Sequence, residues 1–344
     1  MSGGGRTACG VDRGRRAVLR GVGAAVAAVV WAPEALRADP RRAALVDALV
    51  RQTGLPRAEV AAALTQARYR DSVIRRITTP YEARPYAAYR PLFVRRRLAD
   101  QGRAYLREHA AVFAAARARY HVQPEMIAAI LGMESHYGRR RGRDRVLDAL
   151  YTLAVGYPRR ADFFRRELGE FLLMCHEERR DPASVVGSYA GAFGTTQFIP
   201  SSYRAYAVDG DGDGRRDVWD SPTDIIYSVA NYFHRHHWDD RRPVAHWLPE
   251  GAGRRAPIAA LIAARSLRWR ALADLRPELG RLPAHWRDDD RVTVIALAVE
   301  EGVERPLLIH YNFHVITRWN RSRNYAMAAT ELAAMLGSAL CAVS

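Results

Sequence analysis

Apolar residues recur at helical spacing over most of this chain. Across residues 41–77, alanine, leucine and valine alternate with arginine and glutamine in this period, and a break at Gly54-Leu55-Pro56 predicts two helices. The same pattern predicts further helices at 98–120, 162–178, 222–235 and 322–340. The chain is therefore expected to be mainly helical.

Two segments near the C-terminus have the composition of β-strands instead. Residues 291–299 and 306–315 are rich in valine, isoleucine and leucine, and the polar turn 300–304 between them predicts a hairpin. We therefore expect a mainly α (α+β) fold with a small β-sheet inserted late in the chain.

A further predicted helix, 124–138, is apolar on every side until it reaches a carboxylate. Pro124 suits the first turn of a helix, Gly138 suits a C-terminal stop, and the residues between Glu125 and Glu134 are all uncharged. Glu134 then stands where a buried helix opens onto a pocket. Desolvation there disfavours the carboxylate, so we expect a raised pKa and a role as a proton donor. The alternative is a salt bridge with one of the many arginines.

The composition adds a strong positive charge. Lys+Arg number 53 against 37 Asp+Glu, which gives a net charge of +16, and every one of these cations is an arginine. Such a charge favours a polyanionic partner, for example nucleic acid, acidic lipid or a carboxylate-bearing cell-wall polymer. The arginines are scattered and lack the interleaved aromatic residues typical of single-strand binding, so we do not expect a nucleic-acid partner.

The N-terminus predicts export. Arg15-Arg16 precedes the uncharged stretch 21–31, which suits the apolar core of a signal peptide, and the arginine pair resembles a twin-arginine leader. We place the export signal at residues 1–38. No later run reaches the length of a membrane-spanning helix, so residues 39–344 are expected to form a soluble periplasmic protein. Cys9 precedes the uncharged stretch, which is the wrong side for a lipid-modified cysteine, so a lipoprotein is not expected.

A second polar and aromatic stretch, 187–203, is suited to line a sugar site. The small residues from Ala190 to Gly194 permit the close approach of a backbone or a ligand. Ser188 and Gln197 offer hydrogen bonds, and neighbouring aromatic rings offer flat apolar faces. The alternative is tight helix packing with polar residues left at the ends.

Four motifs in order carry a resemblance to a known family. They are Glu134-Ser135-His136-Tyr137-Gly138, the stretch 188–202, the acidic loop 209–224 and the segment 312–327. The match extends from about residue 75 to 335 and resembles the membrane-bound lytic murein transglycosylase B family. The resemblance implies a lysozyme-like core that cleaves the β-1,4 bond between N-acetylmuramic acid and N-acetylglucosamine in peptidoglycan glycan strands.

The resemblance also implies an organisation of the exported chain. An N-terminal helical part, 39–100, would precede a lysozyme-like core, 101–240, that includes a calcium loop at 209–224. A small sheet-containing lobe, 241–311, would be inserted before the C-terminal part of the core, 312–344. Cell-wall synthesis proteins would be further partners.

Carried over position by position, the resemblance assigns roles to single residues. Glu134 falls on the catalytic acid/base of the family, and Ser188 and Gln197 would contact the N-acetyl region of the sugar. The other residues implied to line the groove are Tyr89, Tyr232, Trp319, Asn320 and Tyr325. The family usually has tyrosine where this chain has Trp319; an indole still stacks on a sugar, but a hydrogen bond from the phenol is lost.

The implied mechanism uses one carboxylate, whereas most glycosidases use two. The substrate's own 2-acetamido group would stabilise the oxocarbenium centre. Glu134 would protonate the leaving oxygen and then deprotonate the muramic acid 6-hydroxyl, which closes on C1 to give a 1,6-anhydro sugar. No cofactor is needed for this catalysis. The alternatives are a hydrolytic muramidase of similar fold and a catalytically silent murein-binding protein.

The acidic loop has the spacing of an EF-hand, in which oxygen ligands stand at positions one, three, five, seven and twelve. The residues at these positions are Asp209, Asp211, Asp213, Arg215 through its carbonyl, and Asp220. Glutamate is usual at position twelve, so either the affinity is low or Asp224 closes a longer loop, as the resemblance suggests. We expect a structural Ca²⁺ here, with a solvated acidic turn as the alternative.

Overall fold

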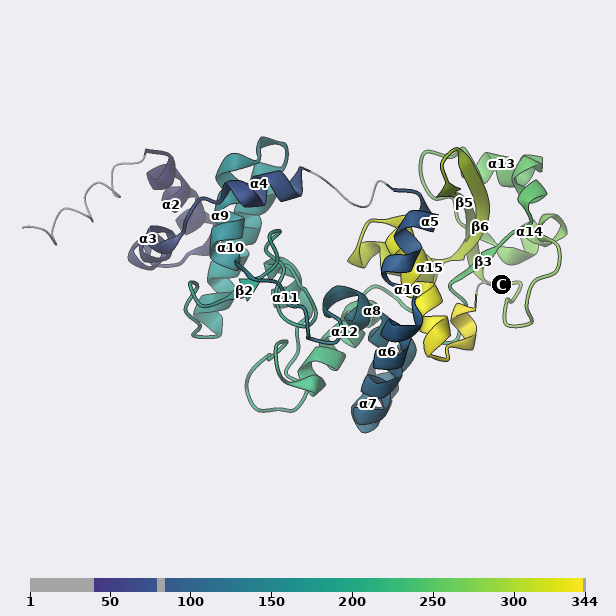
Figure 1. Cartoon of the computed structure of the whole chain (residues 1–344), viewed down its shortest axis with the longest axis horizontal. Coiled ribbons are helices and arrows are strands. Elements are labelled where there is room, and N and C mark those ends of the chain that lie inside the picture. The colour runs from purple at the N-terminus through teal and green to yellow at the C-terminus, as the bar shows by residue number, and fades with distance from the viewer. Residues whose placement is uncertain (1–39, 79–83, 343–344) are drawn as a thin grey trace, which may run out of the picture. The chain divides into compact units, whose positions relative to one another are not determined.

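Figure 1 shows the protein as a computed structural model that describes residues 40–78 and 84–342. The chain divides into two units, Met1–Leu45 and Val46–Ser344, and all the described helices and strands from residue 57 onward belong to the second unit. The predicted export signal lies outside the described residues. Within the described ranges, no helix has the length and apolar character needed to span a membrane.

The described residues are mainly helical, as the apolar pattern predicts. The α-helices are α2 (Pro40–Thr53), α3 (Arg57–Gln66), α4 (Asp71–Ile77), α5 (Tyr86–Tyr89), α6 (Arg96–Glu108), α7 (Ala110–Tyr120), α8 (Pro124–Ser135), α9 (Val146–Gly156), α10 (Ala161–Glu177), α11 (Pro200–Tyr206), α12 (Pro222–Arg235), α13 (Ala256–Ile262), α14 (Leu272–Leu279), α15 (Tyr311–Trp319) and α16 (Arg323–Leu336). Short 3₁₀ helices are η2 (Arg90–Leu92), η3 (Pro158–Arg160), η4 (Glu250–Arg254) and η5 (Ala339–Cys341).

The N-terminal region contains three helices, α2 to α4, where the sequence predicted two. The backbone between α3 and α4 leaves helical geometry because side chains of α9 bind it. The N–H of Arg68 donates to Oδ1 of Asp148 (3.0 Å), and the N–H of Arg70 donates to Oγ1 of Thr152 (2.9 Å). These acceptors lie about eighty positions further along the chain, so local periodicity does not reveal them.

The single helix predicted over 98–120 is also divided, into α6 and α7. The two helices meet at His109, whose backbone has φ −113° and ψ 29°. The ring of His109 packs edge-on against Tyr105, with 4.5 Å between the ring centroids. The alanine-rich pattern continues through this corner, and the sequence therefore does not mark it.

Four strands form a sheet late in the chain, and the predicted hairpin is at its centre. The order is β3-β6-β5-β4, and every neighbouring pair is antiparallel. The strands are β3 (Ala245–Trp247), β4 (Arg270–Ala271), β5 (Arg291–Glu300) and β6 (Val303–His310). Figure 1 shows α13 and α14 beside this sheet, and an apolar cluster that includes Ile258, Leu272 and Leu308 joins them to it. A second sheet pairs only β1 (Asp144–Arg145) and β2 (Val186–Gly187).

Strand β6 ends at His310 and not at residue 315 as predicted. α15 starts immediately, because Nδ1 of His310 accepts the N–H of Asn312 (3.1 Å) and caps the helix. Burial lowers the pKa of His310 to about 4. The imidazole is therefore neutral near pH 7, and its Nδ1 lone pair can accept this hydrogen bond.

Helix α8 is buried along its length against α6, α7, α12 and α16. All residues from Met126 to Met133 are buried, which confirms the prediction from their apolar pattern. Gly132 allows Tyr137 to fold back onto the helix, since a Cβ at this position would lie 2.5 Å from the phenol oxygen. Glu134 is thus presented at the end of a rigid helix.

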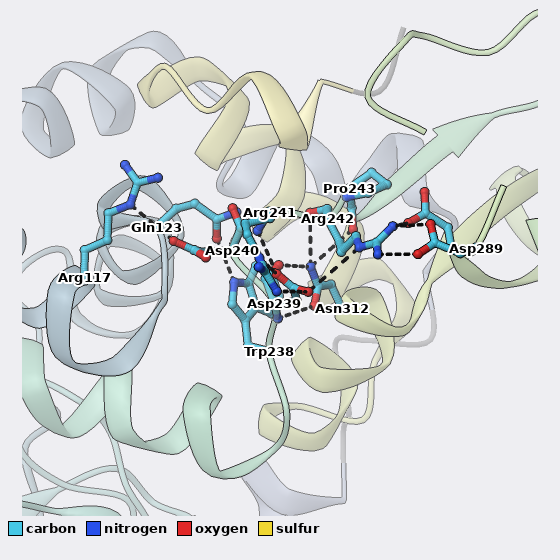
Figure 2. Close-up of polar contacts among 11 residues, drawn as sticks. Arg117, Gln123, Trp238, Asp239, Asp240, Arg241, Arg242, Pro243, Asp289 and Asn312 are labelled. Carbon is cyan, nitrogen blue, oxygen red and sulfur yellow. Dashed lines mark hydrogen bonds and ion pairs between the residues drawn. The ribbon is translucent and has the colours of Figure 1, made fainter. Parts of the chain in front are cut away.

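A polar network fixes the segment after α12 to the start of α15, as Figure 2 shows. Asn312 is fully buried, and its Nδ2 donates to the carbonyls of Asp239 (2.8 Å), Arg242 (3.2 Å) and Pro243 (3.3 Å). Its Oδ1 accepts the N–H of Asp239 (3.0 Å). One amide side chain therefore satisfies four backbone groups of this segment.

The same network reaches the sheet on one side and α8 on the other (Figure 2). The Arg242 guanidinium pairs with Asp289 (2.7 Å) and with the buried Asp290 (2.8 Å), both just before β5. Gln123, which precedes α8, accepts the indole N–H of Trp238 (2.7 Å). Since α15 starts from this network, its position relative to α8 is fixed by buried polar contacts.

Candidate active site

Glu134 lies between two neutral hydrogen-bond donors from the C-terminal helices. Its Oε1 accepts the indole N–H of Trp319 (2.8 Å) and the phenol O–H of Tyr325 (2.7 Å). Trp319 is the last residue of α15, and Tyr325 is in the first turn of α16. The Glu134 side chain remains partly exposed. The three residues that the sequence placed in one site therefore meet, although almost two hundred positions separate Glu134 from Tyr325.

Tyr325 is held as a donor by its surroundings. Burial, followed by the charge of Glu134, raises the pKa of Tyr325 well above its usual range. The phenol therefore keeps its proton at any physiological pH. Tyr89 and Tyr232, both predicted to line the groove, lie close enough to contribute electrostatically to the same shift.

Aromatic rings from two other segments pack around Trp319. The indole lies 4.7 Å from Tyr232, 5.1 Å from Phe198 and 5.9 Å from Phe233, measured between ring centroids. Trp319 therefore packs as part of an aromatic wall built from three segments. The sequence predicted that tryptophan at this position loses the hydrogen bond of a phenol. The indole N–H of Trp319 nevertheless donates a hydrogen bond, to Glu134.

Helix α5, which carries Tyr89, is attached to α16 by a buried carboxylate. Glu331 of α16 accepts the phenol O–H of Tyr86 at Oε1 (2.9 Å) and pairs with Nε of Arg90 at Oε2 (2.6 Å). Tyr86 and Arg90 flank Tyr89, which is itself buried. These contacts hold α5, and with it Tyr89, against α16, the helix that carries Tyr325. The sequence did not reveal Glu331 as the common partner of Tyr86 and Arg90.

Ser188 and Gln197 bind the backbone of their own loop, and Gln197 also binds the segment that follows α8. Oγ of Ser188 accepts the N–H of Ala192 (3.1 Å). Nε2 of Gln197 donates to the carbonyls of Gly194 (2.8 Å) and Arg141 (3.1 Å). These bonds shape the loop that the sequence selected as a sugar site, while contact with the N-acetyl group remains a prediction.

Ser135 connects this loop to the end of α8, a role that the sequence did not reveal. Its Oγ donates to the carbonyl of Thr195 (2.7 Å) and accepts the N–H of Gly138 (3.0 Å). The side chain is fully buried. A buried hydroxyl needs a partner, so a serine at the end of an apolar helix was the available signal.

Asn320 shapes the turn between the two donors of Glu134. Its Oδ1 accepts the N–H of Ser322 (3.0 Å), and Oγ of Ser322 accepts the N–H of Tyr325 (3.2 Å) to cap α16. Asn320 directly follows Trp319 in the chain. These two hydrogen bonds fix the turn that separates Trp319 from Tyr325.

The acidic loop brings three of its predicted calcium ligands together. Carboxylate oxygens of Asp209, Asp211 and Asp213 all lie within 4.8 Å of one another. Calcium binds oxygen at 2.3–2.6 Å, so two ligands of one ion lie at most about 5 Å apart. The residues present thus fit a calcium ion. The N–H of Arg215 donates to Oδ1 of Asp213 (2.8 Å), which keeps the loop tightly turned.

Of the two acids considered for closing the calcium loop, Asp220 pairs with an arginine outside the loop and Asp224 binds the backbone of the loop. Oδ1 of Asp220 pairs with Arg141 (2.8 Å). Asp224 is fully buried and accepts the N–H groups of Gly210 (2.8 Å) and Asp217 (2.6 Å). Asp224 therefore holds the two ends of the loop together through its backbone.

Comparisons with known proteins agree on one family. A model of the transglycosylase SLT domain matches residues 38–334. The chain is 37% identical over 311 residues to membrane-bound lytic murein transglycosylase B of Escherichia coli (strain K12), a match that covers 86% of this chain and 82% of that protein.

Solved structures give the same result. Soluble lytic transglycosylase SltB1 of Pseudomonas aeruginosa superposes with a TM-score of 0.75 at 39% identity, covering 86% of this chain and 98% of that one. The Escherichia coli lytic transglycosylase Slt35 in complex with calcium has a TM-score of 0.74 at 34% identity, covering 87% and 93%. SltB3 of Pseudomonas aeruginosa in complex with NAG-NAM-pentapeptide has a TM-score of 0.75 at 29% identity, covering 87% and 80%.

Proposed function

The chain belongs to the SLT transglycosylase family of lytic murein transglycosylases, and from this premise we propose that Glu134 is the single acid/base of a cleavage that leaves 1,6-anhydro-N-acetylmuramic acid ends. The protein is an enzyme of peptidoglycan cleavage. What supports the finer proposal is the geometry at Glu134. A partly exposed carboxylate stands at the end of a buried helix, with two neutral donors on one oxygen.

The two donors define how Glu134 moves a proton. Because Trp319 and Tyr325 both bind Oε1, we place the transferable proton on Oε2. Oε2 protonates the glycosidic oxygen as the bond to C1 breaks. The resulting carboxylate is stabilised by the two hydrogen bonds and then removes the proton from the 6-hydroxyl of the muramic acid. That oxygen attacks C1, and Glu134 returns to its protonated form.

The surroundings of Glu134 favour intramolecular attack over hydrolysis. The aromatic wall of Phe198, Tyr232 and Trp319 limits the access of water to the reacting sugar, and a 6-hydroxyl held near C1 has a high effective concentration. We further propose that Ser188 and Gln197 contact the N-acetyl group through atoms not used within their loop.

Peptidoglycan lies outside the cytoplasmic membrane, and this supports a location for the enzyme. We propose that it acts in the periplasm on glycan strands that carry stem peptides, as SltB3 is found with NAG-NAM-pentapeptide. Recruitment by cell-wall synthesis proteins is part of the same proposal.

Digestion of purified sacculi tests the proposed product. The soluble muropeptides are expected to be one water lighter than products of hydrolysis, because the ring closure consumes no water. Mass spectrometry of the released fragments measures this difference. Products with reducing ends would instead identify a hydrolytic muramidase, and no release at all would leave only a murein-binding role.

We also propose that the acidic loop binds a structural calcium ion through Asp209, Asp211 and Asp213. The cluster of their oxygens supports this, as does the calcium complex of Slt35. The loop lies between α11 and α12, so the ion would stabilise the connection between these helices and would take no part in the reaction.

Thermal unfolding with and without calcium tests the metal site. An ion bound only to the folded state adds about 2.7 kcal/mol of stability at a hundred times its dissociation constant, so calcium is expected to raise Tm of chelator-stripped protein. Asp213→Ala is expected to remove the increase. The matched control Asp274→Ala, an exposed aspartate of α14, should retain it. A Tm that calcium leaves unchanged in the wild type would show an ordinary solvated turn.

A further inference from the structure

The acidic loop is bonded to Thr195, a buried residue of the loop before α11. The N–H of Thr195 donates to the carbonyl of Val218 (2.8 Å), and its Oγ1 donates to the carbonyl of Trp219 (3.1 Å). The carbonyl of Thr195 accepts the hydroxyl of Ser135 (2.7 Å), which directly follows Glu134 in the chain. Thr195 therefore joins the acidic loop to the helix that carries the proposed acid/base.

The two segments pack closely around these hydrogen bonds. Gly194 permits the approach, since a Cβ at this position would lie 2.8 Å from the carbonyl oxygen of Val218. The indole of Trp219 stacks on Phe193, with 5.4 Å between the ring centroids and 8° between the ring planes. Val218 and Phe193 are both fully buried. A close-packed contact transmits displacement, so a shift of the acidic loop at this point also displaces Thr195.

The proposed calcium ligands stand directly before this contact in the chain. Their carboxylate oxygens are within 4.8 Å of one another, so the like charges repel, and a bound cation offsets this repulsion. Asp213, the last of these ligands, is followed by a turn in which Asp217 accepts the N–H groups of Trp219 (2.8 Å) and Asp220 (3.0 Å). An ion that orders Asp213 is therefore expected to order the carbonyl groups that bind Thr195.

We propose that Thr195 is a positioning residue that couples calcium binding in the acidic loop to the catalytic carboxylate. The inference rests on the proposed function, since it takes Glu134 as the acid/base and the acidic loop as the calcium site. The ion stays outside the reaction. It acts through the hydrogen bonds of Thr195, which hold Ser135 at the end of α8 and keep Glu134 in place against Trp319 and Tyr325.

The first experiment measures kcat and KM on soluble glycan strands with chelator-stripped and with calcium-saturated protein, at a temperature at which circular dichroism shows both forms folded. Calcium is expected to raise kcat of the wild type by about three- to tenfold with KM almost unchanged, because Glu134 acts on bond cleavage. Thr195→Val keeps the shape of the side chain but removes the hydrogen bond to Trp219, and should lose most of this gain. Thr195→Ser retains the hydroxyl and should retain the gain.

Thr293→Val is the matched control. Thr293 is as deeply buried as Thr195, but its Oγ1 has no hydrogen-bond partner among the residues that the structure describes. The same chemical change therefore removes no hydrogen bond there. The variant should keep the wild-type response of kcat to calcium.

Two further measurements do not depend on activity. Calorimetry gives Kd for calcium, and Thr195→Val is expected to bind the ion about two- to tenfold more weakly, because coupling between two sites is reciprocal. The indole N–H resonance of Trp319, assigned by its absence in Trp319→Phe, reports the hydrogen bond to Glu134. It should shift on addition of calcium in the wild type and in Thr195→Ser, but not in Thr195→Val.

The outcomes separate this inference from the proposed function. A wild type that binds calcium without a change in kcat or in the Trp319 resonance would overturn the coupling, while the acid/base and the calcium site stand. A calcium effect on KM alone, a full response in Thr195→Val, its loss in Thr195→Ser or an equal loss in Thr293→Val would also overturn it. If Thr195→Val does not fold, the wild type and Thr195→Ser still decide. Wild type that binds no calcium would refute the proposed calcium site, and the coupling with it.

Discussion

Glu134→Gln is expected to fold normally and to release muropeptides from sacculi about 10²–10⁴-fold more slowly than the wild type. Glutamine has nearly the same shape, and its amide oxygen can still accept the hydrogen bonds of Trp319 and Tyr325 at the position of Oε1. It cannot carry the transferable proton. The rate of release of soluble fragments, with the circular dichroism spectrum and Tm as checks of folding, measures the effect.

Glu125→Gln is the matched control for this variant. Glu125 is in the first turn of the same helix, α8, and undergoes the same chemical change. Its removal is expected to leave the rate of cleavage almost unchanged. If Glu134→Gln retained the wild-type rate, the acid/base role of Glu134 would be wrong, whatever the product of the reaction.

Asn312→Ala is expected to lower the free energy of unfolding by about 2–4 kcal/mol. The amide satisfies one N–H and three carbonyls of the segment 239–243 in a fully buried position. The carbonyl of Asp239 keeps the N–H of Arg242 as a donor, but alanine removes the Asn312 partner of the Asp239 N–H and of the carbonyls of Arg242 and Pro243. Each unsatisfied buried group costs about 1–3 kcal/mol before any relaxation or entry of water. Urea unfolding of the two proteins measures the difference.

Arg241→Ala provides the comparison from the same network (Figure 2). Arg241 pairs with Asp239, but it is exposed, and exposed ion pairs contribute little. Its removal is expected to change the unfolding curve only slightly. A similarly small change for Asn312→Ala would mean that the buried amide does not hold α15 in place.

Elements with a strong local pattern could be predicted from the sequence. Helix α8 is apolar from Met126 to Met133, and the burial of this stretch on all sides follows from that. The β5–β6 hairpin follows from its β-branched residues and polar turn. The break after α3 could not be predicted, because its cause is a pair of side chains on α9. The end of β6 was missed for a related reason, since a buried His310 caps the next helix within an apolar run.

The residues of the candidate site also fall into two groups, those that the sequence could predict and those that it could not. Glu134, Trp319 and Tyr325 could be selected from motifs, and the structure brings them into direct contact. The residues that position these three side chains could not be selected from motifs. Ser135 finds its acceptor 60 positions away, and Glu331 meets Tyr86 across 245. No periodicity within either segment encodes such a partner.

Trp319 is the position at which the sequence departs from the usual pattern of the family. The sequence suggested that stacking is kept and a phenol hydrogen bond is lost. In the structure the indole N–H donates to Glu134 while the ring joins the aromatic wall. Trp319 thus serves both as a hydrogen-bond donor to Glu134 and as part of the aromatic wall.

The central claim is that one carboxylate drives an intramolecular ring closure in which water takes no part. Digestion of sacculi by the wild type in ¹⁸O-labelled water, followed by mass spectrometry of the released muropeptides, tests it most directly. The account predicts 1,6-anhydro ends without the label. Reducing ends that carry ¹⁸O would contradict it, because water would then be the nucleophile at C1.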